Sequence, residues 1–104
     1  MLTISFEFRK GIFFIRLIGD LNKESYKSKE KELINLITQN KFEYIVINTN
    51  YLKNIDIAGL NYLTKMYYIT QENKCNLIIC DKFKVIKRLL NDSIPNIEDE
   101  LEVL

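Results

Sequence analysis

The hydrophobic pattern changes its period several times along the chain, and each change predicts a new element. Alternating apolar residues over 2–8 predict a half-buried strand, and the mostly apolar run 12–18 predicts a second, more central strand. Gly11 lies in the short turn between them and can take a positive φ, which favours a hairpin. Apolar residues at helical spacing then predict an amphipathic helix over 23–39, with Asn22 as its N-cap.

Short apolar runs and helical patterns alternate through the second half of the chain. The continuous β-branched run 44–47 is typical of a strand covered on both faces, and we expect 48–54 to be a loop. Asp56 can cap a helix that ends near residue 73. The remaining elements are expected as a buried strand over 76–79, a helix from Asp81 with Phe83, Ile86, Leu89 and Leu90 on its apolar side, an edge strand over 96–98 and a terminal turn over 99–104.

This order of elements predicts an α/β fold. We expect one domain over residues 1–104, with a mixed, mostly parallel sheet of about five strands, begun by a β-hairpin, and three to four helices. Right-handed crossovers would bring the connections 19–22, 48–56 and 80–82 to one end of the sheet. Binding sites of open α/β sheets usually lie at that end, so we expect the functional residues there.

Composition narrows the range of functions. With 47% hydrophobic residues the chain can bury a core without a disulfide or a metal. The 15 basic and 14 acidic residues lack the basic excess of a nucleic-acid-binding domain. His is absent, which removes the commonest general base and every His-containing metal site. We therefore predict no catalytic residue, no metal and no cofactor.

Cysteine usage and hydropathy bear on the compartment. Cys75 and Cys80 have no Cys or His neighbours in sequence, so we expect buried free thiols in a reducing cytosol. The chain shows neither a signal-peptide pattern nor an apolar run long enough to cross a bilayer. We predict a cytoplasmic protein without direct membrane insertion. A basic helix face is typical of a solvated surface, but it could also meet an acidic partner or a membrane surface; it comprises Lys82, Lys84, Lys87 and Arg88.

Several short motifs follow one another in the order of a known bacterial family. They are Arg16-Leu17-Ile18-Gly19-Asp20-Leu21, Ile45-Val46-Ile47-Asn48, Ile55-Asp56-Ile57-Ala58-Gly59-Leu60, Val85-Ile86-Lys87-Arg88-Leu89-Leu90 and Ile97-Glu98-Asp99-Glu100. In this order the chain resembles the STAS domains of sulphate transporters and of bacterial anti-sigma-factor antagonists. The resemblance covers essentially the whole chain and implies a binding module without catalysis of its own.

The family resemblance also singles out one position. In the antagonists, a partner kinase, which is also the anti-sigma factor, phosphorylates the first Ser of an Asp-Ser-Ser/Ala-Gly-Leu motif. Here Asp56, Gly59 and Leu60 match the motif, and Ile57 stands where the phosphorylated residue would be. We therefore predict no phosphorylation at this site. The nearest hydroxyls, on Thr49 and Thr64, are not expected to occupy the acceptor's place.

The predicted contact surface combines the turn after the second strand with the start of the helix capped by Asp56. We expect Ile57 to be an exposed apolar contact, although it could also be packed against the fold. Asp56 is sufficient as a helix cap, and Gly59 is expected to allow close packing or close approach. The predicted partner-binding residues are Asp20, Asn22, Asp56, Ile57, Ala58, Gly59 and Asn61.

The resemblance leaves more than one function open. We expect a non-catalytic partner-switching regulator whose partner is a kinase-like anti-sigma factor or another STAS protein. The alternative is a small cytosolic STAS subunit that docks on the ATPase of an ABC-type lipid transporter. A small-molecule binder is a third possibility, and its four candidate stacking residues are Tyr51, Tyr62, Tyr67 and Tyr68. The apolar strand 2–8 could also pair across a homodimer.

Overall fold

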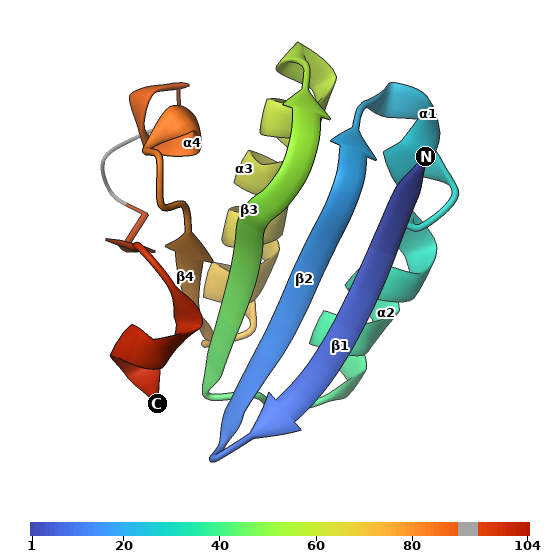
Figure 1. Ribbon diagram of the computed structural model, residues 1–104. Helices are drawn as coiled ribbons and strands as arrows, with labels where there is room; N and C mark the ends of the chain where they lie inside the picture. The colour runs from blue at the N-terminus through green and yellow to red at the C-terminus, as the bar shows by residue number, and fades with distance from the viewer. Residues whose placement is uncertain (90–93) are drawn as a thin grey trace.

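The protein is a five-stranded sheet with three helices packed behind it (Figure 1). The computed structural model describes residues 1–89 and 94–104. The strands are β1 (Leu2–Arg9), β2 (Ile12–Leu21), β3 (Tyr44–Ile55), β4 (Asn76–Cys80) and β5 (Asn96–Ile97). The helices are α1 (Lys23–Lys27), α2 (Glu30–Gln39), α3 (Ile57–Glu72) and α4 (Val85–Leu89), followed by the 3-10 helix η1 (Glu100–Val103).

The sheet is mixed, as the sequence predicts. β1 and β2 are antiparallel, and the later strands follow in parallel in the order β2-β3-β4-β5. Arg9 pairs with Ile12, so Lys10 and Gly11 form a two-residue turn with φ values of 52° and 81°. Positive φ at both positions is the mark of a type I′ hairpin turn, for which Gly is well suited.

The main core lies between the sheet and the helices. Alternate residues of the strands, such as Ile15 and Ile47, face Leu33 and Ile37 of α2 and Leu63 of α3, and all are almost fully buried. Beyond these, Tyr26 of α1 stacks on Tyr62 of α3 with 3.7 Å between ring centroids. The helices are therefore fixed to one face of the sheet by a continuous apolar layer.

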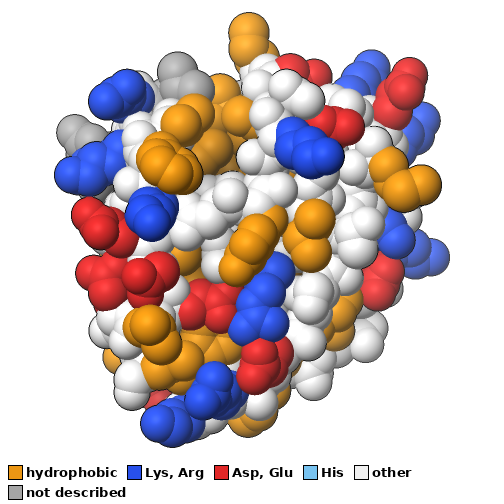
Figure 2. Space-filling model, viewed as in Figure 1, with side chains coloured by type: hydrophobic (Ala, Val, Ile, Leu, Met, Phe, Trp, Pro, Cys, Tyr) orange, Lys and Arg blue, Asp and Glu red, His pale blue; other side chains and the backbone are white. Residues whose placement is uncertain are grey.

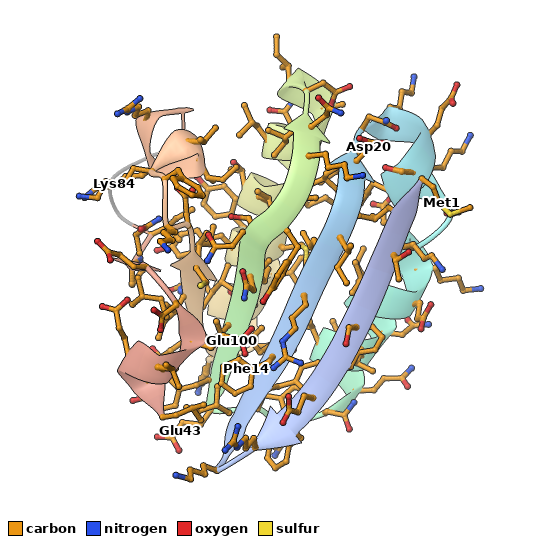
Figure 3. The ribbon with its side chains drawn as sticks, in the orientation of Figure 1. Met1, Phe14, Asp20, Glu43, Lys84 and Glu100 are labelled. Carbon is orange, nitrogen blue, oxygen red and sulfur yellow. The ribbon has the colours of Figure 1, made fainter. Side chains whose placement is uncertain are left out.

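The opposite face of the sheet carries a smaller cluster. Phe14, Val46 and Cys80 are buried there beneath the C-terminal segment, which adds Val103 and Leu104. Glu100 at the start of η1 accepts hydrogen bonds from Arg16 (2.6 and 2.8 Å) and from Asn48 (2.7 Å). Figure 3 shows Glu100 and Phe14 in front of the sheet, so η1 is tied to this face by both packing and charge.

Two predicted loops are strand instead. The turn expected at 19–22 lies largely within β2, and the loop expected at 48–54 lies within β3. The extensions pair with each other in parallel, from Ile18 opposite Tyr51 to Leu21 opposite Ile55. The polar composition of 48–54 indicated a loop, but pairing with β2 satisfies its backbone and buries Leu52 and Ile55 in part against the core.

The single helix predicted over 23–39 is two helices. α1 ends in a tight turn, because the Lys29 N–H bonds the Tyr26 carbonyl oxygen at 2.8 Å, and the Ser28 hydroxyl donates to the Ser25 carbonyl oxygen at 3.1 Å. Local hydrogen bonds of this kind compete with the regular helical pattern. The predicted amphipathic face survives the break, with Tyr26, Leu33 and Ile37 all buried.

The prediction for the last helix was wrong in two respects. α4 begins at Val85 rather than Asp81, whose carboxylate accepts from the N–H groups of Val85 (3.2 Å) and Lys87 (2.9 Å). Phe83, expected on the buried side, is 70% exposed, whereas Ile86 is buried as expected. The side chain of Leu89 and the whole of Leu90 lie outside the described residues.

The cysteine prediction is confirmed in its structural part. Both Cys75 and Cys80 are buried and free. Burial raises the pKa of both thiols, that of Cys80 to about 11. Since the thiolate is the reactive form, neither residue is a ready nucleophile.

Candidate functional site

The predicted site residues gather where β2 and β3 end. Asp20 pairs with Asn54 and Leu21 pairs with Ile55, so the two strands end side by side. α1 begins directly after β2, and α3 directly after β3, at the same end of the sheet (Figure 1). We call this surface the rim, formed by residues 20–22 and 54–61.

Asn22 fixes the start of α1. Its side-chain oxygen accepts from the Ser25 N–H at 3.0 Å, and the Ser25 hydroxyl oxygen accepts from the Asn22 N–H at 3.0 Å. This reciprocal pair is a capping box, which satisfies two helix-terminal donors at once. The Ser25 hydroxyl also donates to the Asp20 carbonyl oxygen at 2.8 Å, so the end of β2 and the start of α1 are held together.

Asp56 does the same for α3. Its carboxylate accepts from the Gly59 N–H at 2.8 Å, and its own N–H donates to the Leu21 carbonyl oxygen at 3.3 Å. The side chain is therefore the N-cap that the sequence predicts. The backbone contact to Leu21 joins the two strand ends, so the helix start is positioned relative to β2 as well as β3.

Gly59 is buried against the strand ends. A Cβ atom at this position would collide with the Leu21 carbonyl oxygen and come within 2.9 Å of the Ile55 side chain. The prediction of close packing is confirmed, and it explains why the first turn of α3 can lie directly on the ends of β2 and β3. Gly59 supports the rim from below, because it is buried against the ends of β2 and β3.

Ile57 is exposed. As the first residue of α3 it presents 77% of its surface to solvent, so the alternative of a packed side chain is excluded. Asn61 lies one turn further along and is also exposed, whereas Ala58 is half-buried. Positions four apart share a helix face, so Ile57 and Asn61 form one outward surface.

Asp20 is held by two donors. Its carboxylate accepts from the Asn54 side-chain amide at 2.8 Å and from the Met1 amino group at 3.1 Å. The Asn54 hydrogen bond first, and the Met1 ammonium second, hold the pKa of Asp20 below its usual range. Figure 3 shows Asp20 and Met1 close together at the end of β2 and the start of β1, where the Asp20 carboxylate and the Met1 ammonium form an ion pair.

The two neighbouring threonines are engaged within the fold. Thr49 is buried in β3, and its hydroxyl donates to the Cys80 carbonyl oxygen at 2.9 Å. The Thr64 hydroxyl is partly buried and donates to the Leu60 carbonyl oxygen at 3.1 Å. Neither hydroxyl lies at the exposed first turn of α3.

Sequence reasoning missed the contribution of the strand extensions to the site. Asn54, which donates to Asp20, was assigned to a loop, and so was Tyr51, which pairs with Ile18 in the extension of the two strands. The sequence did carry a signal for this extended strand, because the aliphatic residues Leu52 and Ile55 stand in an otherwise mostly polar segment.

The four candidate stacking tyrosines differ in their surroundings. Tyr62 stacks on Tyr26 and Tyr67 packs in part against the core, whereas Tyr51 and Tyr68 are each 57% exposed. In the ranges 1–89 and 94–104, no three His, Cys, Asp or Glu side chains cluster as metal ligands would. No helix in this part of the chain is long and apolar enough to cross a bilayer.

Comparisons with known proteins give the class of this fold and site. The model of the family described as STAS domain matches residues 3–95, and the chain therefore belongs to the STAS domain family. Among curated proteins it is similar to an anti-sigma F factor antagonist from Paenibacillus polymyxa. The two are 24% identical over 108 residues, which cover 99% of this chain and 92% of that protein.

Solved structures agree on the fold. The chain is similar to the anti-sigma factor antagonist SpoIIAA in its unphosphorylated form, with a TM-score of 0.80, 15% identity and coverage of 97% of this chain and 93% of that one. It is also similar to an anti-sigma factor antagonist from Mycobacterium paratuberculosis, with a TM-score of 0.76, 13% identity and coverage of 98% and 90%. The predicted α/β architecture is thus confirmed.

Proposed function

We propose that this chain is a cytoplasmic, non-catalytic protein-binding module that acts as an anti-sigma-factor antagonist, with Ile57 at the centre of its contact surface. The observation that carries the proposal is the 77% exposure of Ile57 on the rim. Its similarity to proteins named as anti-sigma factor antagonists along nearly its whole length supports the same class of function.

An exposed Ile at a helix N-terminus is suited to a contact that is made only in a complex. Removing an aliphatic side chain of this size from water contributes about 1.5–3 kcal/mol. The residues around it are held in place by the caps of Asn22 and Asp56, so little ordering is needed on binding. The polar side chains of Asp20 and Asn61 border the apolar centre, as in many protein interfaces.

The same position explains how this module would differ from its phosphorylated relatives. A phosphate adds about two negative charges, which would disrupt an apolar contact by desolvation and repulsion. Ile57 has no hydroxyl and cannot be converted in this way. We infer that the module stays in the binding-competent form, and that binding is set by concentration or by the state of the partner.

The proposal is tested by affinity capture from a lysate of the source organism, with the captured proteins identified by mass spectrometry. Ile57→Glu places a charge at the centre of the surface. Tyr68→Glu is the matched control, because Tyr68 is 57% exposed on the same helix three turns away. We expect wild type and Tyr68→Glu to capture a kinase-like ATPase or another STAS protein, and Ile57→Glu to lose it.

Two outcomes would overturn this assignment. Equal capture by Ile57→Glu would show that the rim is not the contact surface. Capture of an ABC-type ATPase in place of a kinase-like one would support the transporter-subunit alternative and exclude the proposed function as an anti-sigma-factor antagonist.

A further inference from the structure

A groove opens on the other side of the β3 tip, where β3 continues past the end of β4. β4 ends at Cys80 opposite Asn48, so the outer half of β3 has β2 as its neighbour on one side and the segment leading into α4 on the other. The lining of the groove includes the apolar residues Leu52, Ile55 and Ile86 and the polar residues Thr49, Asn50 and Asn54. Its volume of about 140 Å³ suits one large side chain, since drug-sized ligands occupy about 300–1,000 Å³.

One wall of this groove is apolar, and basic side chains lie around its mouth. Phe83 and Val85 are 70% and 47% exposed on one wall, and Lys53 lies on the other. Lys82 and Lys84 flank Phe83, and neither these two nor Lys53 forms an ion pair with another described residue. Figure 2 shows hydrophobic side chains gathered at the upper left with basic side chains around them. We call this surface the basic groove.

The one acidic lining residue does not cancel this charge pattern at the surface. Asp81 is buried, and its two carboxylate oxygens accept from the backbone N–H groups of Val85 and Lys87. A ligand at the mouth of the groove would therefore meet ammonium groups first. An occupant needs an apolar side chain with carboxylates beside it.

The chain itself carries such a segment. Leu101 in η1 is 78% exposed, and Glu98, Asp99 and Glu102 beside it are exposed as well. None of these three carboxylates pairs with a basic side chain in the described parts of the chain, unlike Glu100, which Arg16 holds. Figure 2 shows acidic side chains gathered on the left of the molecule, below the basic groove. We call residues 98–102 the acidic turn.

We propose that the basic groove binds the acidic turn of a second copy of this chain, with Leu101 as the side chain that enters it. The turn is held rigid by a capping box, in which the Asp99 carboxylate accepts from the Leu101 N–H at 2.8 Å and Glu102 reaches back to the Asp99 N–H at 3.0 Å. Leu101 is therefore presented at little cost in conformational entropy.

This contact joins two different surfaces of the same chain. The acidic turn and the basic groove lie apart on one molecule, with η1 at the lower left and α4 at the upper left of Figure 1. Such a head-to-tail contact leaves one groove and one turn open at the ends, so copies can continue to add. The inference does not rest on the proposed function, because it uses neither Ile57 nor Asp20.

Sedimentation velocity over rising protein concentration tests the inference. We expect the wild-type protein to form assemblies larger than a dimer as its concentration approaches millimolar, and added salt to weaken this association. Two variants should each weaken association about tenfold or more: Leu101→Ser, which removes the side chain that enters the groove, and Lys53→Glu/Lys82→Glu, which reverses the groove edges. One control should associate like wild type: Lys27→Glu/Lys31→Glu, which makes the same charge change on exposed helix positions.

Mixing the two weakened variants gives the sharpest result. Leu101→Ser keeps its groove and Lys53→Glu/Lys82→Glu keeps its turn, so an equimolar mixture should form dimers and nothing longer. A monomeric wild type at every concentration would overturn the inference. So would undiminished association of both variants, which would point to another surface such as the edge of β1. Rescue to long assemblies in the mixture would contradict it as well.

Discussion

The two halves of β3 differ in their neighbouring strands and in their exposure to solvent. The inner half pairs with β2 on one side and β4 on the other, and Ile45, Val46 and Ile47 have no exposed surface. The outer half pairs with β2 alone, and Tyr51 is 57% exposed. Because the outer half of β3 has no β4 beside it, it borders two surfaces: the rim beyond its end and the basic groove along its open side.

The largest expected effect separates the two halves directly. Ile47→Ala removes a fully buried side chain between sheet and helices and should lower the free energy of unfolding by about 2–4 kcal/mol. Tyr51→Ala, four residues on, should change it by less than about 0.5 kcal/mol. Urea denaturation of both variants measures the difference. Equal losses would show that the outer half contributes to the core as much as the inner half.

Gly59→Ala tests how tightly α3 rests on the strand ends. In an exposed helix this change usually stabilises, because Ala loses less backbone entropy than Gly. Here the new Cβ would collide with the Leu21 carbonyl oxygen, so we expect a loss of about 1–3 kcal/mol on urea denaturation. Wild-type or higher stability of the variant would contradict the close contact between α3 and β2.

A helix-cap change gives a smaller effect at the rim. Asp56→Ala removes the acceptor for the Gly59 N–H and should cost about 1 kcal/mol in thermal or urea denaturation. Asp56→Asn keeps an acceptor oxygen and serves as the matched control, with a loss of only a few tenths of a kcal/mol. If both variants lose the same stability, the charge of Asp56, rather than its capping bond, stabilises the helix start.

The pH dependence of the free energy of unfolding tests how η1 is attached to its face of the sheet, the face opposite the helices. The Arg16 hydrogen bonds hold the pKa of Glu100 below its usual range, although its burial opposes the shift. A depressed folded-state pKa stabilises the fold above the unfolded pKa of about 4.3, and this stability is lost as pH falls through the folded value. We expect Glu100→Gln to be less stable than wild type at neutral pH and to lose less on acidification.

Denaturation curves at a series of pH values measure that contrast. The control is Glu24→Gln, since Glu24 is exposed on α1 and outside the salt bridges of the described residues. Parallel acid losses in wild type and Glu100→Gln would show that the Arg16 contact does not attach η1 to the sheet.

The sequence predicts the inner parts of this fold better than its outer parts, and the reason is physical. Ile45–Ile47 and the hairpin over 2–18 carry hydrophobic patterns that burial alone requires. The stretch 48–54 is polar because much of it lies at the surface. Its strand geometry depends on pairing with the extension of β2, which the local sequence does not reveal. Phe83 was assigned to the buried side by helical spacing, but the helix begins only at Val85, so that spacing does not apply to it.

The site divides in the same way. The caps of Asn22 and Asp56 could be predicted, because each depends on residues close in sequence. For Gly59 the sequence indicated close packing, but not that the contact is the Leu21 carbonyl oxygen at the end of β2. The link from Asn54 to Asp20 and the basic groove depend on how β3 aligns with β2 and with the start of α4, which is a tertiary property.

The measurement that tests the central claim most directly uses the captured kinase-like partner in purified form. Its affinity for the chain is determined by calorimetry before and after incubation with ATP and Mg²⁺, for wild type and for Ile57→Ser. We predict that wild type gains no phosphate by mass spectrometry and keeps its affinity, whereas Ile57→Ser is phosphorylated and binds at least tenfold more weakly. Phosphorylation of the wild-type chain with loss of binding would contradict the account, because it would place the switch at another residue.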